Sequence, residues 1–249
     1  MTRLLIIGGT DSSGGAGLTR DAWVAQAHGI AVAPVVSVVT AQTNSRLHAA
    51  WPMPADSVGQ QIAAALACGP VGAVKIGALG THDNAAAVHE ALAGQGAAVV
   101  FDPVLKTSSG GGLLSGPPPW PLLARAALVT PNLQEAAMLA QRPLPQTPAQ
   151  VVSVAEVILS KGARAVLIKG GHGTGPMSCD MLKTATQQHV FQSPRLRAEL
   201  RGTGCALATA IACNLAQGRD LKAAIGAAKA FVHACLQAGT YLEAEAIRP

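Results

Sequence analysis

The stretch Arg201-Gly-Thr-Gly-Cys-Ala-Leu-Ala-Thr-Ala-Ile-Ala-Cys213 joins a glycine turn directly to an apolar run. The two glycines let the backbone turn tightly and point successive N–H groups in one direction. A helix that begins there adds its unpaired amides and the positive end of its dipole. We therefore expect an anion hole at Gly202, Thr203 and Gly204, closed by the thiol of Cys205. Such a hole suits a phosphoryl group in transfer between two oxygens.

Upstream of this stretch, short apolar runs alternate with longer amphipathic ones. The short runs indicate strands buried on both faces: Leu4–Gly8, Val35–Thr40, Ala73–Ile76, Ala98–Phe101, Ala127–Thr130 and Ala165–Lys169. The longer runs predict helices: Leu18–His28, Ser57–Ala67, Thr81–Ala93, Leu133–Ala140 and Ala149–Lys161. Near the end we expect a hairpin and two closing helices: Met181–Thr184 with His189–Gln192, then about Cys205–Ala216 and Leu221–Ala238.

This alternation predicts right-handed βαβ units. The fold class is therefore α/β, a three-layer α/β/α sandwich with a mostly parallel central sheet. No linker or repeat divides the chain, so we expect a single domain over residues 1–249. Among the helix starts, Asp56 or Ser57 is expected to cap the second helix, and Thr147 precedes a proline at a first helical position.

Composition excludes several classes of protein. No apolar run is long enough to cross a bilayer, although hydrophobic residues make up 49% of the chain. The first apolar run is too short for a signal peptide, so we expect a cytoplasmic protein without a membrane partner. Five dispersed cysteines argue against a disulfide framework and against structural zinc. The net charge of +5 is dispersed and aromatics are only 3%, so we expect no nucleic-acid partner.

Polar motifs follow the predicted strands, and ligands bind beyond the carboxyl ends of parallel strands. The glycine-rich segment Gly8–Gly17 favours a ligand loop. Asp21, just beyond it, is either a ligand contact or a partner of the helix dipole. Gln42 offers a donor and an acceptor that match the edge of an aminopyrimidine, but its spacing alone favours a polar turn residue.

Later motifs also leave two interpretations open. Asp102, which precedes the segment Ser108–Gly112, either holds Mg²⁺ or caps a loop. Asn132 and Glu135 are either metal ligands or an N-cap and its N3 partner. Lys169 either meets phosphate oxygens or is a solvated lysine in a glycine-rich turn. Arg201, at the rim of the anion hole, is expected to attract a polyphosphate.

Taken together, these motifs resemble the hydroxymethylpyrimidine/phosphomethylpyrimidine kinases of thiamine biosynthesis, in the ribokinase-like superfamily. The matching segments span nearly the whole chain in order: Gly8-Gly-Thr-Asp-Ser-Ser-Gly-Gly-Ala-Gly17, Asp21, Thr40-Ala-Gln42, Lys75-Ile-Gly77, Asp102-Pro-Val104, Thr130-Pro-Asn-Leu-Gln-Glu135, Lys169-Gly-Gly-His172 and Gly202-Thr-Gly-Cys205. The resemblance implies transfer of the ATP γ-phosphoryl group to a pyrimidine's hydroxymethyl oxygen, and in many members a second transfer to the monophosphate. It also implies an enzyme that is often a homodimer.

The resemblance assigns roles to residues by position. The pyrimidine pocket would be lined by Gly9, Ala16, Asp21, Gln42 and Val104. Mg²⁺ would be organised by Asp102, Asn132 and Glu135. Lys169 and Arg201 would meet the phosphates of ATP. The anion hole would be Gly202, Thr203 and Gly204, with Cys205 as the catalytic cysteine.

This chain departs from the family pattern at several positions. The segment Glu199-Leu200-Arg201 stands where members usually have Thr and Asn followed by His, and Ala78 stands where a methionine is usual. Phosphoryl transfer asks mainly for alignment and charge neutralisation. We expect the helix N-terminus, Arg201 and bound cations to lower the pKa of Cys205, so that the thiolate accepts the alcohol proton late in the transfer.

Two other functions compete with this interpretation. The first is a pyridoxal kinase, since the same fold accepts another hydroxymethylated aromatic ring. Cys205 and Gln42 favour the pyrimidine. The second is a catalytically weak pyrimidine-binding sensor, which the altered approach to the anion hole suggests.

Overall fold

The computed structural model describes residues 2–105, 116–171, 173, 175–197 and 200–241. Three features of the sequence predictions lie outside these ranges: the segment Ser108–Gly112, His172 and Glu199. All other predicted elements and site residues fall inside them.

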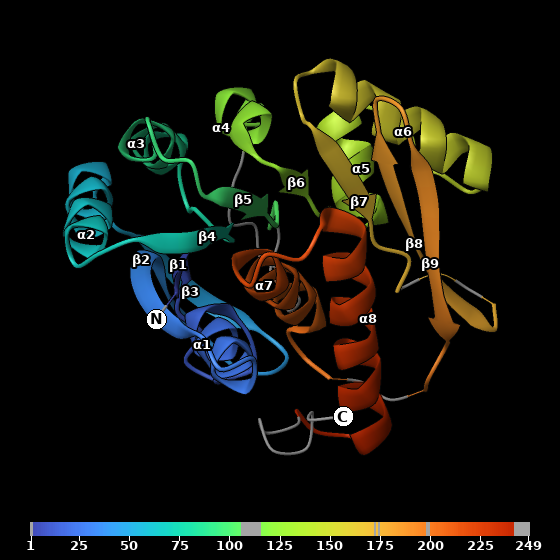
Figure 1. The fold of residues 1–249 in the computed structure, drawn as a ribbon, viewed down its shortest axis with the longest axis horizontal. Coiled ribbons are helices and arrows are strands. Elements are labelled where there is room, and N and C mark those ends of the chain that lie inside the picture. Colours follow the sequence, from blue (N-terminus) through green and yellow to red (C-terminus); the bar gives the residue numbers. More distant parts are fainter. Residues whose placement is uncertain (1, 106–115, 172, 174, 198–199, 242–249) are drawn as a thin grey trace.

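The described strands form one nine-stranded sheet with the order β3-β2-β1-β4-β5-β6-β7-β8-β9 (Figure 1). Its parallel centre contains β2 (Ala31–Gln42), β1 (Arg3–Gly9), β4 (Val71–Ile76), β5 (Ala98–Phe101), β6 (Leu128–Val129) and β7 (Ala165–Ile168). Antiparallel strands complete the edges: β3 (Leu47–Pro52) on one side, β8 (Met177–Thr184) and β9 (Gln188–Pro194) on the other. The mostly parallel sheet and the late hairpin are therefore confirmed.

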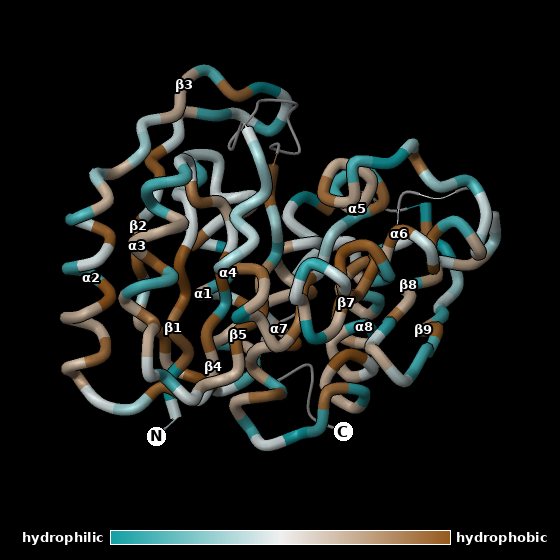
Figure 2. The backbone as a smooth tube through the Cα atoms, turned by 90° about the horizontal axis from the view of Figure 1, so that it is seen from above, coloured by the Kyte–Doolittle hydropathy of each residue, from teal (hydrophilic) through white to brown (hydrophobic). Residues whose placement is uncertain are grey.

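Helices cover both faces of this sheet (Figure 1). One face packs against α1 (Gly17–Ala27), α7 (Thr203–Ala216) and α8 (Leu221–Ala238). The other packs against α2 (Ala55–Ala67), α3 (His82–Ala91), α4 (Trp120–Arg125), α5 (Leu133–Ala140) and α6 (Pro148–Ser160). Alternate residues of β1 enter the two cores, Leu4 with Ile6 and Leu5 with Ile7. Figure 2 shows β1 and α7 as strongly hydrophobic segments, and the predicted three-layer sandwich is confirmed.

Two elements were not predicted. Strand β3 is an edge strand whose residues are half-buried or exposed, so its sequence lacks the apolar run of the central strands. Helix α4 has only six residues and follows a proline-rich segment. The predicted cap at Asp56 or Ser57 is wrong, because the cap position is two to three residues earlier, at Pro54, which makes no side-chain cap. Thr147 does cap α6, in a capping box with Gln150.

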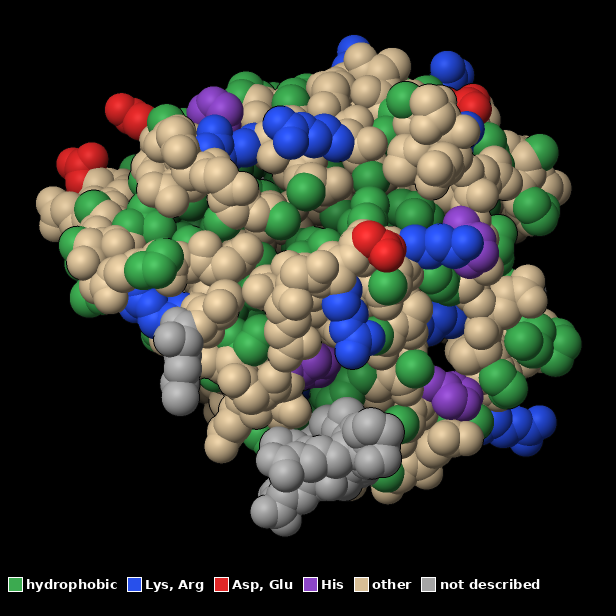
Figure 3. Space-filling view, in the orientation of Figure 1, with side chains coloured by type: hydrophobic (Ala, Val, Ile, Leu, Met, Phe, Trp, Pro, Cys, Tyr) green, Lys and Arg blue, Asp and Glu red, His purple; other side chains and the backbone are tan. Residues whose placement is uncertain are grey.

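The surface carries its charges in dispersed positions. On the face seen in Figure 3, lysine, arginine and acidic side chains are scattered over several elements. Across the described part of the chain, no helix combines the length and the apolar character that spanning a bilayer would require.

The two ends of α1 provide a matched stability test. Gly17 and Gly29 both have positive φ, +61° and +70°. A Cβ at Gly29 would meet nothing within 4 Å, whereas a Cβ at Gly17 would clash with the Gly9 carbonyl oxygen. We expect Gly29→Ala to lower the free energy of unfolding by about 1–2 kcal/mol, the strain of a left-handed alanine. Gly17→Ala should lower it by a further 1–3 kcal/mol or so, because the β1 backbone must move. Urea unfolding measures both, and equal losses would contradict the close approach of α1 to β1.

Candidate active site

Two helix N-termini meet at the carboxyl edge of the parallel strands. Helix α1 follows Ala16, helix α7 follows Gly202, and neither of these residues caps its helix with a side-chain hydrogen bond. A Cβ at Gly202 would lie 2.5 Å from the Gly15 carbonyl oxygen and 3.2 Å from Cα of Ala16, and φ at Gly202 is +76°. Only glycine fits there, and the positive ends of two helices come together. This is the predicted anion hole, and it faces the glycine-rich loop after β1.

A buried ionic network lies one helical turn below this junction. Lys75, on β4, places Nζ 2.6 Å from Oδ2 of Asp21, on α1, and both side chains are inaccessible to solvent. Thr209, on α7, donates a hydrogen bond of 2.7 Å to the other carboxylate oxygen. Burial is the largest single effect and lowers the pKa of Lys75, but the charge of Asp21, its hydrogen bond and the neighbouring Cys205 and Asp102 together outweigh it. The pKa is therefore raised and the ammonium stays charged. The network ties α1, α7 and the sheet together.

The dipole interpretation of Asp21 is therefore not supported, since its carboxylate faces Lys75 and Thr209 instead. No acidic residue lies in the first turn of α1.

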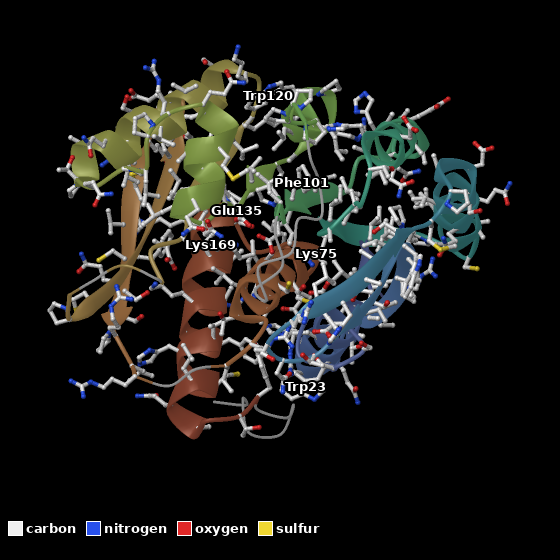
Figure 4. The ribbon with its side chains drawn as sticks, turned by 180° about the vertical axis from the view of Figure 1, so that it is seen from behind. Trp23, Lys75, Phe101, Trp120, Glu135 and Lys169 are labelled. Atoms are coloured by element: carbon white, nitrogen blue, oxygen red, sulfur yellow. The ribbon has the colours of Figure 1, made fainter. Side chains whose placement is uncertain are left out.

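A second cluster of charges lies on the far side of the anion hole. Lys169 follows β7, and its Nζ lies 2.6 Å from Oδ1 of Asp102, which follows β5. A Cβ at Gly204 would lie 3.2 Å from that Nζ, so Lys169 reaches the first turn of α7. Figure 4 shows Glu135 and Lys169 close together in the C-terminal half, with Lys75 towards the N-terminal half. The structure thus brings predicted phosphate and metal residues to one edge of the anion hole.

Asn132 and Glu135 form a complete capping box at the start of α5. The Asn132 side chain accepts a hydrogen bond of 2.9 Å from the Glu135 amide, and Oε2 of Glu135 accepts one of 2.8 Å from the Asn132 amide. Burial raises the pKa of Glu135 to about 7, which Asp102 reinforces and Lys169 opposes. The capping interpretation is therefore confirmed, and a metal role stays a prediction.

The remaining oxygens fit Mg²⁺ by their chemistry. No described residue hydrogen-bonds to Oδ2 of Asp102 or to Oε1 of Glu135. Mg²⁺ commonly takes one or two carboxylates and keeps several waters. Among the described residues there is no group of three or more His, Cys, Asp or Glu side chains arranged for a metal ion. A site completed by substrate phosphates and water agrees with both observations.

Cys205 is partly exposed at the first turn of α7. The expectation of a lowered pKa is wrong. Burial raises the pKa of this thiol to about 11, and Asp21 and Asp102 add to the rise. Lys75 and a hydrogen bond with the Gly17 amide oppose it with smaller effect. Arg201 does not help, because its guanidinium points towards Asp11.

The predicted pyrimidine residues occupy strand ends in the N-terminal half. Gly9 ends β1 and Ala16 precedes α1. Gln42 ends β2. Its backbone N–H donates to the Ser12 hydroxyl, and its backbone carbonyl accepts from the same hydroxyl, both at 2.8 Å. Val104 lies two residues beyond Asp102 and is half-buried. All of these are at the carboxyl edge of the parallel strands.

Sequence reasoning assigned no role to two residues of the buried network. Lys75 carried a visible signal, since it is a charged residue inside an otherwise apolar strand. Thr209 lies one helical turn after Cys205 and resembles any other small helical residue, so nothing in the sequence distinguishes it.

Comparisons with known proteins agree with this geometry. The family model described as phosphomethylpyrimidine kinase matches residues 11–248. The chain is 37% identical over 246 residues to the hydroxymethylpyrimidine/phosphomethylpyrimidine kinase of Rhizobium meliloti, covering 96% of this chain and 92% of that protein. The Streptomyces coelicolor protein of the same name is 36% identical over 241 residues, covering 95% and 89%.

Two solved structures are similar along most of the chain. The Clostridium difficile phosphomethylpyrimidine kinase has a TM-score of 0.80 and 29% identity, covering 94% of this chain and 99% of that one. The ADP complex of Bacillus subtilis pyridoxal kinase has a TM-score of 0.84 and 29% identity, covering 94% and 91%.

The raised pKa of Cys205 makes a prediction for alkylation. The thiolate is the reactive form, so a rise of the pKa from 9.0 to about 11 leaves about 100-fold less thiolate at pH 8. We expect the rate of Cys205 labelling by iodoacetamide, followed by peptide mass, to rise about tenfold per pH unit from pH 7 to 10. Labelling of the exposed Cys68 in the same samples controls for reagent quality. A Cys205 rate that levels off below pH 9 would contradict the raised pKa.

Proposed function

The chain belongs to the phosphomethylpyrimidine kinase family, and from that premise we propose that it phosphorylates 4-amino-5-hydroxymethyl-2-methylpyrimidine with ATP in thiamine diphosphate biosynthesis, and then its monophosphate. Its fold is ribokinase-like, as in the solved pyrimidine and pyridoxal kinases. The observation that carries the proposal is the junction of two uncapped helix N-termini at Gly202, with Lys169 reaching Gly204. Such a junction favours the charge that develops on a phosphoryl group in transit.

The pyrimidine would bind in the N-terminal half of the site. The Gln42 carboxamide offers a donor and an acceptor to the aminopyrimidine edge. Gly9, at the end of β1, Ala16, before α1, and Val104, beyond β5, would line the same pocket. Asp21 lies at the floor, where its ion pair with Lys75 fixes the start of α1. This arrangement directs the hydroxymethyl oxygen towards the anion hole.

The nucleotide would bind in the C-terminal half, with Lys169 at its phosphates. Asp102 and Glu135, supported by Asn132, would hold Mg²⁺ through the oxygens that described residues leave available. Bound Mg²⁺ neutralises charge on the polyphosphate. Lys169 is well suited to add to this, because Asp102 and Glu135 raise its pKa against the opposing effect of burial and keep it charged.

The chain's own residues then have two tasks in the transfer. The amides of Gly202, Thr203, Gly204 and Cys205 hold the moving phosphoryl group in line between two oxygens. Cys205 accepts the alcohol proton after the new bond to phosphorus has begun to form. Because the thiol is neutral at ordinary pH, it must first release its own proton to solvent, and Lys75 and the Gly17 amide favour the thiolate that results.

A second candidate acceptor is pyridoxal. The likeness to Bacillus subtilis pyridoxal kinase, with a TM-score of 0.84, favours it. Both acceptors are flat heterocycles with a hydroxymethyl group, so the same anion hole serves either. We place the pyrimidine first, because the curated relatives with 36–37% identity are named as pyrimidine kinases.

The chemistry makes a direct prediction. With the pyrimidine alcohol, ATP and Mg²⁺, mass spectrometry should find products heavier by one and then two phosphoryl groups. Pyridoxal under the same conditions should be phosphorylated more slowly. Omission of Mg²⁺ should abolish turnover with either acceptor.

Two variants, Cys205→Ala and Cys205→Ser, test whether the thiol accepts the proton. Loss of the proton acceptor should lower kcat by about 100-fold, the low end of general acid–base effects. An alanine variant with near-normal turnover would remove the base proposal and leave the anion hole in place. Faster phosphorylation of pyridoxal than of the pyrimidine would instead reverse the order of acceptors.

We also propose that residues 1–249 form a single cytoplasmic kinase domain that acts as a homodimer. The nine described strands of one sheet support the single domain. For the dimer, the support is the edge strand β3, where Trp51 pairs with Val39 of β2 and the two side chains are 56% and 38% exposed. An exposed edge with apolar side chains is a template for pairing.

Light scattering after size exclusion should give twice the chain's mass. Trp51→Lys should shift the protein towards the monomer, whereas the same change at Met138, another exposed apolar side chain, should not. A wild-type monomer at high concentration would contradict the dimer, and cell fractionation tests the cytoplasmic location.

A further inference from the structure

Arg201 connects the anion-hole turn to the loop after β1. Its guanidinium donates to Oγ of Ser13 at 2.6 Å and to Oδ1 of Asn44 at 3.0 Å. It also lies 3.5 Å from Oδ2 of Asp11, a carboxylate that is 5% exposed. Its own carbonyl accepts a hydrogen bond of 2.8 Å from the Tyr241 hydroxyl at the end of α8. Through its side chain and its backbone carbonyl, Arg201 therefore contacts three segments that are far apart in sequence.

These contacts lead towards Gln42. Ser13 donates to Asp11 at 2.7 Å while it accepts from Arg201, so the three side chains form a chain of charge-assisted bonds. The neighbouring hydroxyl, of Ser12, exchanges two hydrogen bonds with the backbone of Gln42. Fixing the segment 11–13 thus also fixes the end of β2.

Arg195, six residues earlier, makes a different set of contacts. Its guanidinium donates to carbonyl oxygens of Gly175 at 2.8 Å and Met177 at 2.9 Å, and also to those of Gly170 and Gly171. These carbonyls belong to the connection that follows Lys169. The two arginines therefore hold opposite sides of the site, and a guanidinium suits each because it presents five N–H groups in a fixed plane.

We propose that Arg201 is a positioning residue for the pyrimidine acceptor, holding the segment 11–13 and the end of β2, and that Arg195 does the same for the nucleotide side. The inference rests on the proposed function, since it takes the N-terminal half as the acceptor side. It differs from the phosphate contact expected for Arg201 from the sequence. That role predicts weaker ATP binding in an Arg201 variant, and positioning predicts weaker acceptor binding.

The test is a crossed measurement on three arginine variants of the full chain. Arg201→Ala should raise KM for the pyrimidine alcohol by about tenfold or more. Its KM for ATP should stay within about twofold of wild type, and its kcat should change less than either KM. Arg195→Ala should show the opposite pattern. Arg197→Ala removes the same charge from the same segment, and Arg197 is exposed and bonds to no described residue, so neither KM should change.

Two further variants guard against loss of folding, since Arg201→Ala leaves the buried Asp11 without its cation. Ser13→Ala combined with Asn44→Ala removes two acceptors of Arg201 and should raise KM for the acceptor in the same direction. Arg201→Lys keeps the charge without the planar fork and should recover part of the loss.

Calorimetric titration of each variant with the pyrimidine alcohol and with ADP separates failure of this inference from failure of the proposed function. If wild-type protein binds the alcohol without turnover, the proposed function fails, and the alcohol Kd of the Arg201 variants still decides the inference. A raised KM or Kd for the nucleotide in Arg201→Ala, with the alcohol unchanged, would overturn it. A wild-type protein that binds no pyrimidine alcohol would overturn both.

Discussion

The site depends on the contact between two helix N-termini, because two positive helix ends repel each other unless something holds them together. Glycine at position 202 permits the approach. Asp21 supplies the attraction, since its carboxylate is carried by α1 and accepts a hydrogen bond from Thr209 of α7. Lys75 of β4 balances that charge at 2.6 Å. The network is close to neutral as a unit, so the helix ends and Lys169 leave a positive field for an anionic ligand.

The same packing explains why Cys205 is a neutral thiol. A rise of its pKa from 9.0 to about 11 corresponds to about 3 kcal/mol against the thiolate. A helix N-terminus contributes about 0.3–1 kcal/mol in its favour at an ordinary surface site. Burial therefore outweighs the dipole, which sequence reasoning took as the deciding effect. A phosphoryl transfer with a loose transition state tolerates this, because it relies on alignment more than on a strong base.

The central strands were predictable because strands buried on both faces give continuous apolar runs, and the polar residues that follow them share one edge by topology. What could not be predicted depends on tertiary contact. Strand β3 has a mixed burial pattern, so only its pairing with β2 identifies it. The direction of Arg201 was equally hidden, because its partner Ser13 is 188 residues away along the chain. The capping box of Asn132 and Glu135 was visible, since both of its members are local in sequence.

Backbone groups hold the proposed nucleotide side of the site, whereas side chains contribute more to holding the proposed acceptor side. This difference decides which side a single substitution can alter. On the nucleotide side, Arg195 holds backbone carbonyls, and Asp180 fixes the Gly170 amide while it pairs with the buried Lys229. Backbone carbonyls remain as hydrogen-bond acceptors when the side chain of their residue is substituted. On the proposed acceptor side, Arg201 contacts the side chains of Ser13 and Asn44 more closely than the one backbone carbonyl it reaches, that of Thr43 at 3.3 Å. A Cβ at Gly15 would lie only 3.0 Å from its guanidinium. Single substitutions can therefore remove contacts of Arg201 more readily than they remove those of Arg195.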